Sequence, residues 1–364
     1  MTGVINDKSI LDLYKKYFPN IKIESDKVKI YSDLDKEYDA LRYGIAIRDI
    51  SDRSMLRLTG GDTVDYLHRI STNSVKDLSE LNFVETLFTN EKGRLIDKTV
   101  LLNLEDHKLL IGSEAEKEAL WYWIEKYIIM EDIKTQDAGS DFNLFEILGP
   151  QKDSYMTLLC GNECEQVTEK NILTRNIEDF EFYLMKLNEV NGIEKYWVLI
   201  STNNTEKFLK YLSSHESVFD VKMVGSEAWE IFRVEKGIPE APNEINDFFN
   251  PYEINLIDKV SFTKGCYIGQ EVIARLDTYE KVQKYLTGII IETGEEIDFP
   301  AKLLSEDGTE AGKITSSVLS KVLKKRLGLA VVRKQYLNEG TNLTAESVIG
   351  NKFNVKVVKI PVGR

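Results

Sequence analysis

Cysteine, proline and histidine are scarce in this sequence, and each scarcity narrows the class of protein. The 364 residues include three cysteines, an odd number that argues against a disulfide framework and favours a reducing cytoplasm. The seven prolines leave no Pro-rich linker, so we expect domains that pack tightly or interleave. The cysteines and the three histidines lack the spacing of a ligand set, so we expect no metal site.

Positive charge and long apolar runs are lacking too. The chain has 47 basic against 60 acidic residues, a formal net charge of −13, whereas nucleic-acid binding needs a basic surface. The longest apolar runs, such as Thr99–Leu104 and Leu286–Ile291, are long enough for a strand but far too short to span a membrane, and the N-terminus shows no apolar signal core. We therefore expect a cytoplasmic protein with no membrane and no direct nucleic-acid partner.

The composition that is present is globular, with 42% hydrophobic and 10% aromatic residues. The length exceeds one ordinary core, so two or three domains are expected. Hairpin patterns alternate with helical ones over the first 240 residues, which predicts an α+β fold. Residues 240–282 are predicted to be loop-rich. Short strands at 285–292, 311–316, 327–332 and 353–360 then predict a small β-barrel or sandwich.

The densest polar motif is the segment Lys264–Glu271, KGCYIGQE, which continues as Val272–Arg275, VIAR. Its two glycines bracket a cysteine and a tyrosine, and they let the backbone bend tightly or approach a ligand. Neighbouring cations would stabilise a thiolate at Cys266. By itself the motif is equally compatible with a buried turn around an inert thiol. Both interpretations stay open on these residues alone.

This segment closely resembles the signature of the YgfZ family, relatives of the glycine-cleavage T-protein that bind tetrahydrofolate and support iron–sulfur enzymes. Three further segments are similar to T-protein segments and follow in the same order: Thr89–Asp97, Arg233–Pro239 and Gly312–Ser317. The resemblance therefore covers nearly the whole chain. The matching signature residues are Lys264, Gly265, Cys266, Tyr267, Gly269, Gln270, Glu271 and Arg275.

The resemblance implies an α+β fold with two interleaved subdomains around a central folate site and a small C-terminal β-barrel. The T-protein-like region would cover residues 1–282, with an inserted subdomain at roughly 54–140, and the barrel would cover 283–364. The implied ligand is tetrahydrofolate or a one-carbon derivative of it. The implied protein partners are iron–sulfur enzymes or cluster-assembly proteins.

Four residues are candidates for the site. Asp97 lies on a largely apolar strand face, where a carboxylate needs a partner. It forms a salt bridge or a hairpin hydrogen bond, or it holds or relays a proton at a cavity, by resemblance beside the folate. Arg233 is a salt-bridged helix arginine, or by resemblance it contacts the folate. Glu194 is the nearest candidate for the pterin-binding glutamate, because a carboxylate accepts paired N–H donors. Cys266 would lie at the rim of the site.

The chain departs from the T-protein pattern near Asp97. Arg94 replaces the second glycine of that segment, Lys98 replaces a second aspartate, and Ser113 replaces an asparagine. These changes argue against aminomethyl transfer and favour a YgfZ-like protein that assists maturation or repair of iron–sulfur enzymes and so affects tRNA modification indirectly. The alternatives are a folate-dependent aminomethyltransferase or methyltransferase and a folate-storage protein. The sequence leaves open whether the protein is an enzyme.

Overall fold

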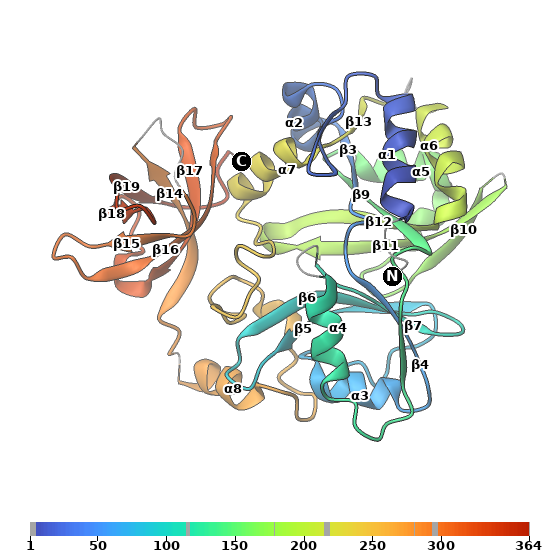
Figure 1. Cartoon of the computed structure of the whole chain (residues 1–364), viewed down its shortest axis with the longest axis horizontal. Coiled ribbons are helices and arrows are strands. Elements are labelled where there is room, and N and C mark those ends of the chain that lie inside the picture. The colour runs from blue at the N-terminus through green and yellow to red at the C-terminus, as the bar shows by residue number, and fades with distance from the viewer. Residues whose placement is uncertain are drawn as a thin grey trace.

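The computed structural model describes residues 5–113, 117–177, 179–214, 219–279, 281–292 and 298–363. Three lobes surround the centre of the molecule: a six-stranded sheet covered by helices, a five-stranded sheet, and a closed barrel (Figure 1). Within these residues, no helix combines the length and the apolar character needed to cross a membrane.

The six-stranded sheet has the order β10-β11-β12-β9-β3-β13. Its strands are β3 (Ile45–Asp49), β9 (Phe142–Leu148), β10 (Leu173–Ile177), β11 (Phe180–Glu189), β12 (Ile193–Ser201) and β13 (Val221–Met223). The helices of this lobe are α1 (Ile5–Tyr17), α2 (Leu34–Tyr43), α5 (Lys152–Cys160), α6 (Thr205–Ser214) and α7 (Ser226–Lys236), and a hairpin is formed by β1 (Lys22–Glu24) and β2 (Lys27–Ile30). Helix α2 begins where the side chain of Asp33 accepts the backbone N–H of Lys36 at 3.0 Å, as an N-cap should.

The five-stranded sheet has the order β5-β6-β7-β4-β8 and is inserted between β3 and β9. Its elements are β4 (Met55–Thr59), α3 (Thr63–Ile70), β5 (Asn82–Thr89), β6 (Leu95–Asn103), β7 (Lys108–Ile111), α4 (Lys117–Glu125) and β8 (Lys134–Asp137). Strands β3 and β9 pair directly across this insertion, with Ile47 opposite Ile147. The two α+β parts therefore interleave along the chain, as expected.

The two sheets pack face to face, and strand alternation explains how. On β6, Val100 and Leu102 belong to the same buried cluster as Trp197 and Leu199 of β12. The intervening Leu101 faces the other way, into the cluster formed with helices α3 and α4. Each sheet thus has two buried faces, and the interface between the sheets forms the centre of the molecule.

The C-terminal lobe is a closed barrel of order β14-β17-β16-β15-β18-β19, which confirms the expected small barrel. Its strands are β14 (Lys284–Ile291), β15 (Ala301–Leu304), β16 (Glu310–Leu319), β17 (Arg326–Arg333), β18 (Asn342–Glu346) and β19 (Lys352–Val358). Short 3₁₀ helices elsewhere occupy Asn162–Gln166, Val190–Gly192, Thr202–Asn204, Ile257–Lys259 and Lys334–Tyr336.

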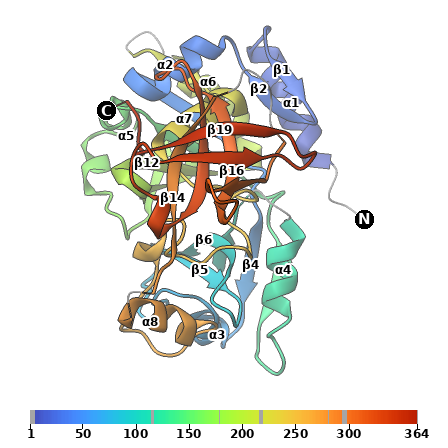
Figure 2. The same cartoon turned by 90° about the vertical axis from the view of Figure 1, so that its left-hand side faces the viewer.

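Among its described residues, the segment predicted to be loop-rich contains one α-helix, α8 (Gln270–Thr278), besides the 3₁₀ helix Ile257–Lys259. Its sequence, QEVIARLDT, lacks a continuous apolar stripe, which is the local signal of a helix. In agreement with this, Ile273 is the one buried residue of the helix. Figure 2, which looks onto the barrel, shows α8 below it and beside α3. The start of α8 belongs to the signature segment.

Candidate functional site

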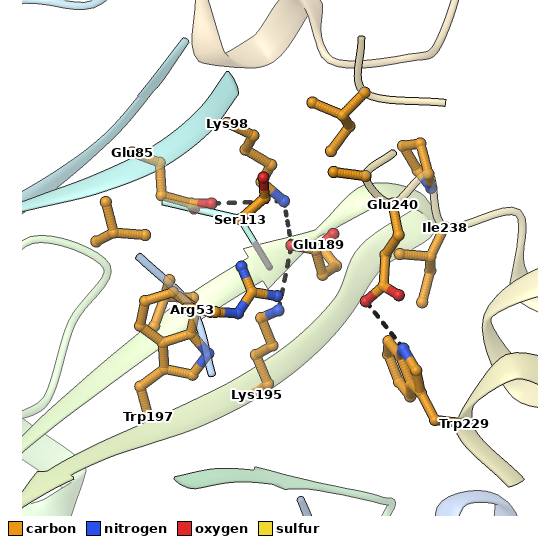
Figure 3. A pocket seen from close by; sticks show the side chains of 15 residues that line it. Arg53, Glu85, Lys98, Ser113, Glu189, Lys195, Trp197, Trp229, Ile238 and Glu240 are labelled. Carbon is orange, nitrogen blue, oxygen red and sulfur yellow. Dashed lines mark hydrogen bonds and ion pairs between the residues drawn. The ribbon is translucent and has the colours of Figure 1, made fainter. Parts of the chain in front are cut away.

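A small, partly open cavity lies at the edge of the interface between the two sheets. It is lined by strands β5 and β6 on one side, by β11 and β12 on the other, and by α7 and the chain that follows it. Its volume is about 40 Å³. The charged lining residues are Arg53, Glu85, Lys98, Glu189, Lys195 and Glu240 (Figure 3).

Glu189 forms ion pairs with two lysine ammonium groups in this cavity. Lys98 of β6 pairs with its Oε1, and Lys195 of β12 lies 3.2 Å from the same atom. Burial alone would raise the pKa of Glu189, but Lys195 and Lys98 outweigh it and hold the pKa at about 2. Lys195 also pairs with Glu146 at 2.7 Å, and Arg48 pairs with Glu146 at 2.6 Å. Glu189 is therefore a charged acceptor in the wall of the cavity at neutral pH.

Two tryptophans form the aromatic part of the wall. Trp229 of α7 donates its indole N–H to Glu240 at 2.9 Å, and the guanidinium of Arg48 lies 3.6 Å from its ring centre. Arg53 lies 5.5 Å from the ring centre of Trp197. Flat rings next to planar cations are suited to a planar heterocycle.

Asp97 does not line this cavity within the described residues, although Lys98 next to it does. Its carboxylate faces α4 and accepts the backbone N–H of Lys98 at 2.8 Å and that of Ser113 at 3.1 Å. Gly112 is needed beside it, because a Cβ there would lie 2.6 Å from Asp97 Oδ2. Burial raises the pKa of Asp97 to about 6, while the hydrogen bonds from Ser113 oppose the rise.

Arg233 lies behind the cavity wall, with 1% of its side chain exposed. Its guanidinium donates to Glu230 at 2.6 Å, to Glu244 at 3.1 Å and to Ser316 Oγ at 2.8 Å. Ser316 belongs to barrel strand β16. Arg233 thus joins α7 to the barrel, and it is not among the residues that line the cavity in the described chain.

Glu194 lies on the other face of the six-stranded sheet from the cavity. Lys195 faces the cavity, so the preceding residue on the same strand must point away from it. The carboxylate of Glu194 pairs instead with Lys186 at 3.1 Å and with Lys152 at 3.3 Å, at the surface. The glutamate of this β11–β12 hairpin that enters the cavity is Glu189.

The signature segment is docked onto the inserted subdomain. The Lys264 ammonium donates to the carbonyl oxygens of His68, Ser71 and Asn73, at and just beyond the C-terminal end of α3. Cations at this end of a helix are favourable, because its last carbonyls lack intrahelical partners. Burial lowers the pKa of Lys264 to about 8.

The second half of the signature packs against the β5–β6 hairpin. Thr89 donates its hydroxyl to the carbonyl of Ile268 at 2.6 Å, and Gly269 adopts φ +85° where α8 begins. A Cβ at Gly269 would lie 2.5 Å from the carbonyl oxygen of Asn90. The segment therefore has a fixed shape, set by contacts with residues that are far away in the sequence.

Within this fixed segment, Tyr267 is buried, whereas Gly265 and Cys266 are exposed. Gln270 is the first residue of α8, and Arg275 forms an exposed pair with Glu271 at 3.6 Å. The signature therefore presents the Cys266 thiol at the surface rather than in the cavity. The other two cysteines, Cys160 and Cys164, are buried.

Sequence reasoning missed five of the six charged residues that line the cavity: Arg53, Glu85, Glu189, Lys195 and Glu240. A signal for Lys195 was present, because this lysine immediately precedes the run Tyr196–Ile200, YWVLI, on the same strand. Among the described residues, no group of three or more His, Cys, Asp or Glu side chains is arranged to hold a metal ion.

Comparison with known proteins places this arrangement in one family. Residues 14–264 match the GCVT N-terminal domain, and residues 284–362 match the glycine cleavage T-protein C-terminal barrel domain. A chloroplastic protein of Arabidopsis thaliana that carries the provisional name of transferase is 27% identical, over 93% of this chain and 76% of its own. An aminomethyltransferase of Thermotoga neapolitana is 23% identical, over 84% and 83%.

A crystal structure of the glycine cleavage system aminomethyltransferase T from Bartonella henselae has the same fold. It superposes with a TM-score of 0.80 at 17% identity and covers 97% of this chain and 96% of its own. The likeness in fold extends over the interleaved sheets and the barrel together. With both of its domain matches in order and covering most of its length, the chain belongs to the glycine cleavage T-protein family.

Proposed function

We propose that this protein binds tetrahydrofolate in the central cavity and, as a YgfZ-type member of the family, assists the maturation or repair of iron–sulfur enzymes. Membership in the T-protein family and the aminomethyltransferase names of its relatives support a folate ligand. The signature segment, with its exposed Cys266, supports the YgfZ assignment. The effect on tRNA modification is then indirect, through the cluster-dependent enzymes.

The polar groups of the cavity suit a pterin. Its amino and ring N–H donors need a carboxylate acceptor, and Glu189 lines the cavity. Lys98 and Arg53 supply donors for a ring carbonyl, and Trp229 supplies an apolar face. A volume of about 40 Å³ holds water rather than a bicyclic ring. Binding therefore requires movement of a wall, such as the Lys98 side chain or the chain after α7.

When bound, tetrahydrofolate supplies a carrier for a one-carbon unit. The chain's own residues hold and orient it: Glu189 accepts from its donors, and Trp197 and Trp229 exclude water. Glu189 takes the place that the sequence had suggested for Glu194. Arg233 acts as a positioning residue through Glu244 and the cavity wall, without touching the ligand.

One observation favours an accessory role over aminomethyl transfer. Lys98, which stands in place of a second aspartate, directs its ammonium into the cavity, while the Asp97 carboxylate is held on the far side of β6 by Ser113. Ser113 itself lines the cavity, so the Asp97 carboxylate is separated from a ligand there by this residue and has no direct contact with it in this arrangement. A catalytic role for Asp97 or Cys266 remains a prediction.

The domain division at 282/283, with an insertion at roughly 54–140, is part of the same proposal. The first barrel strand begins at Lys284, and strands β4 to β8 fall within the insertion. A cytoplasmic location is proposed as well; one relative is chloroplastic by name.

The test is rescue of iron–sulfur enzyme activity in a strain that lacks the protein. We expect the wild-type chain to restore activity and Cys266→Ser to leave it at the level of the deletion strain. Thr263→Ala changes an exposed residue just before the signature segment and should restore activity fully. Full rescue by Cys266→Ser would remove the thiol from the proposal.

The aminomethyltransferase alternative is favoured by the names of the relatives and has its own assay. Purified protein is supplied with an aminomethyl-lipoyl carrier and tetrahydrofolate, and transfer of the one-carbon unit is measured. We expect no turnover above background. Sustained transfer would reverse the order of the two functions.

A further inference from the structure

Glu85 is the one cavity-lining residue whose carboxylate oxygen is both buried and without a hydrogen-bond donor in the described chain. It stands on β5, opposite Val100 of β6, with 11% of its side chain exposed. Buried polar atoms are nearly always hydrogen-bonded, because an unmade bond leaves the cost of desolvation uncompensated. An exception in the wall of a cavity indicates an acceptor reserved for something that enters it.

The two oxygens of Glu85 have different surroundings. Oε1 accepts from the ammonium of Lys259 at 2.9 Å. Oε2 has Lys98 Nζ at 4.0 Å, close enough to compensate charge but too far for a hydrogen bond. Lys98 is drawn the other way by its pair with Glu189 (Figure 3).

The free oxygen does not result from a loose side chain. Lys259 is held by three partners, since it also donates to the Asn188 carbonyl at 3.1 Å and pairs with Asp258 at 3.0 Å. The ammonium therefore fixes Oε1, and the planar carboxylate carries Oε2 with it. Glu85 presents a preorganised, charged acceptor to the cavity.

We propose that Glu85 is a specificity-determining residue, whose Oε2 accepts a hydrogen bond from an amino or ring N–H group of the bound heterocycle. The ligand class is thereby narrowed to heterocycles with a donor at this point, such as the 2-amino group of a pterin. An analogue that carries a carbonyl oxygen in place of this donor is rejected. Glu85 Oε2 then has no hydrogen-bond donor and lies against a second acceptor. This inference rests on the proposed folate function and adds a residue to it.

The test compares two ligands on the full-length protein by calorimetry. One is tetrahydrofolate, and the other is its analogue in which oxygen replaces the 2-amino group. We expect the wild type to prefer tetrahydrofolate on the order of 30-fold. Glu85→Gln can turn its amide N–H₂ to the ligand, so the preference should vanish or invert.

Glu194→Gln is the matched control. It makes the same chemical change in a carboxylate that pairs with Lys186, on the face of the six-stranded sheet that points away from the cavity. It should keep the wild-type preference. Equal affinity of the wild type for the two ligands overturns the role of Glu85 even if the Glu85→Gln protein fails to fold. No binding of tetrahydrofolate at all overturns the proposed function instead, so the two failures are distinguishable.

Discussion

Asp97 and Lys98 are neighbours on β6, and strand alternation sends their side chains to opposite faces. Lys98 enters the cavity, while Asp97 is enclosed between β6 and α4 with 4% exposed. Three contacts from two backbone N–H groups support the buried Asp97 carboxylate, but no cation pairs with it in the described chain. Because burial disfavours the charged form of a carboxyl group, the pKa of Asp97 is raised and the group titrates at a higher pH in the folded protein than in the unfolded chain.

The free energy of unfolding should therefore depend on Asp97 between about pH 4 and pH 6. The pKa of Asp97 is raised from 3.8 to about 6, so in this window the folded protein holds a proton that the unfolded chain has released. Stability contributed by that proton is present at low pH and is lost as the pH rises through 6, by up to about 3 kcal/mol. Asp97→Asn keeps an acceptor for the Ser113 N–H and cannot ionise. Urea unfolding at a series of pH values should show a flatter profile for the variant, and identical profiles would contradict the assignment.

The signature segment forms a joint between secondary-structure elements: it contacts the end of α3 and the β5–β6 hairpin, and it leads directly into α8. Lys264 contacts the end of α3, and Gly269 lies against Asn90 in the hairpin. The contacts are backbone-directed, so they depend on the shape of the segment more than on side-chain packing. Cys266 takes its position from this joint.

Gly269 and Gly265 offer a matched pair for testing the joint. Gly269→Ala places a Cβ 2.5 Å from the Asn90 carbonyl at φ +85°, a conformation that costs an L-residue about 1–2 kcal/mol before any overlap. Gly265→Ala meets no atom within 4 Å. We expect the first variant to lose at least about 2 kcal/mol of unfolding free energy and the second less than about 0.5 kcal/mol. Equal losses in urea titrations would mean that the joint is not rigid.

Local patterns predicted the elements better than they predicted the site. Strand 285–292 was expected and Lys284–Ile291 is observed, because alternating residues and flanking turns are local signals. Helix α8 was missed because its stability comes from contacts with the hairpin rather than from an apolar stripe. The sequence suggested Glu194 as the pterin-binding glutamate, whereas Glu189 is the glutamate of this hairpin that lines the cavity. The face of a strand depends on how two sheets pack, which a single strand does not reveal.

At the scale of the whole molecule, a buried polar cluster connects the barrel to the central cavity. Ser316 of β16 receives hydrogen bonds from Arg233 at 2.8 Å and Asn243 at 3.1 Å, and it donates to Glu244 at 2.7 Å. Arg233 belongs to α7, whose Trp229 lines the cavity. The position of the barrel and the shape of the cavity wall are therefore linked in part through this hydroxyl group, beside other contacts of α7 such as the hydrogen bond from Ser320 to Glu235 at 2.6 Å.

Ser316→Ala should weaken this link without removing a charge. The change leaves Glu244 Oε1 and one N–H of Arg233 without their buried partner, which costs about 1–3 kcal/mol. Ser317→Ala is the control, because the next residue on the strand points to the other face and has one long contact, 3.4 Å from Arg326. Urea unfolding followed by tryptophan fluorescence, to which Trp229 contributes, should show the loss for Ser316→Ala alone. If both variants unfold at the wild-type midpoint, the cluster does not hold the barrel, and the proposed positioning role of Arg233 loses its support.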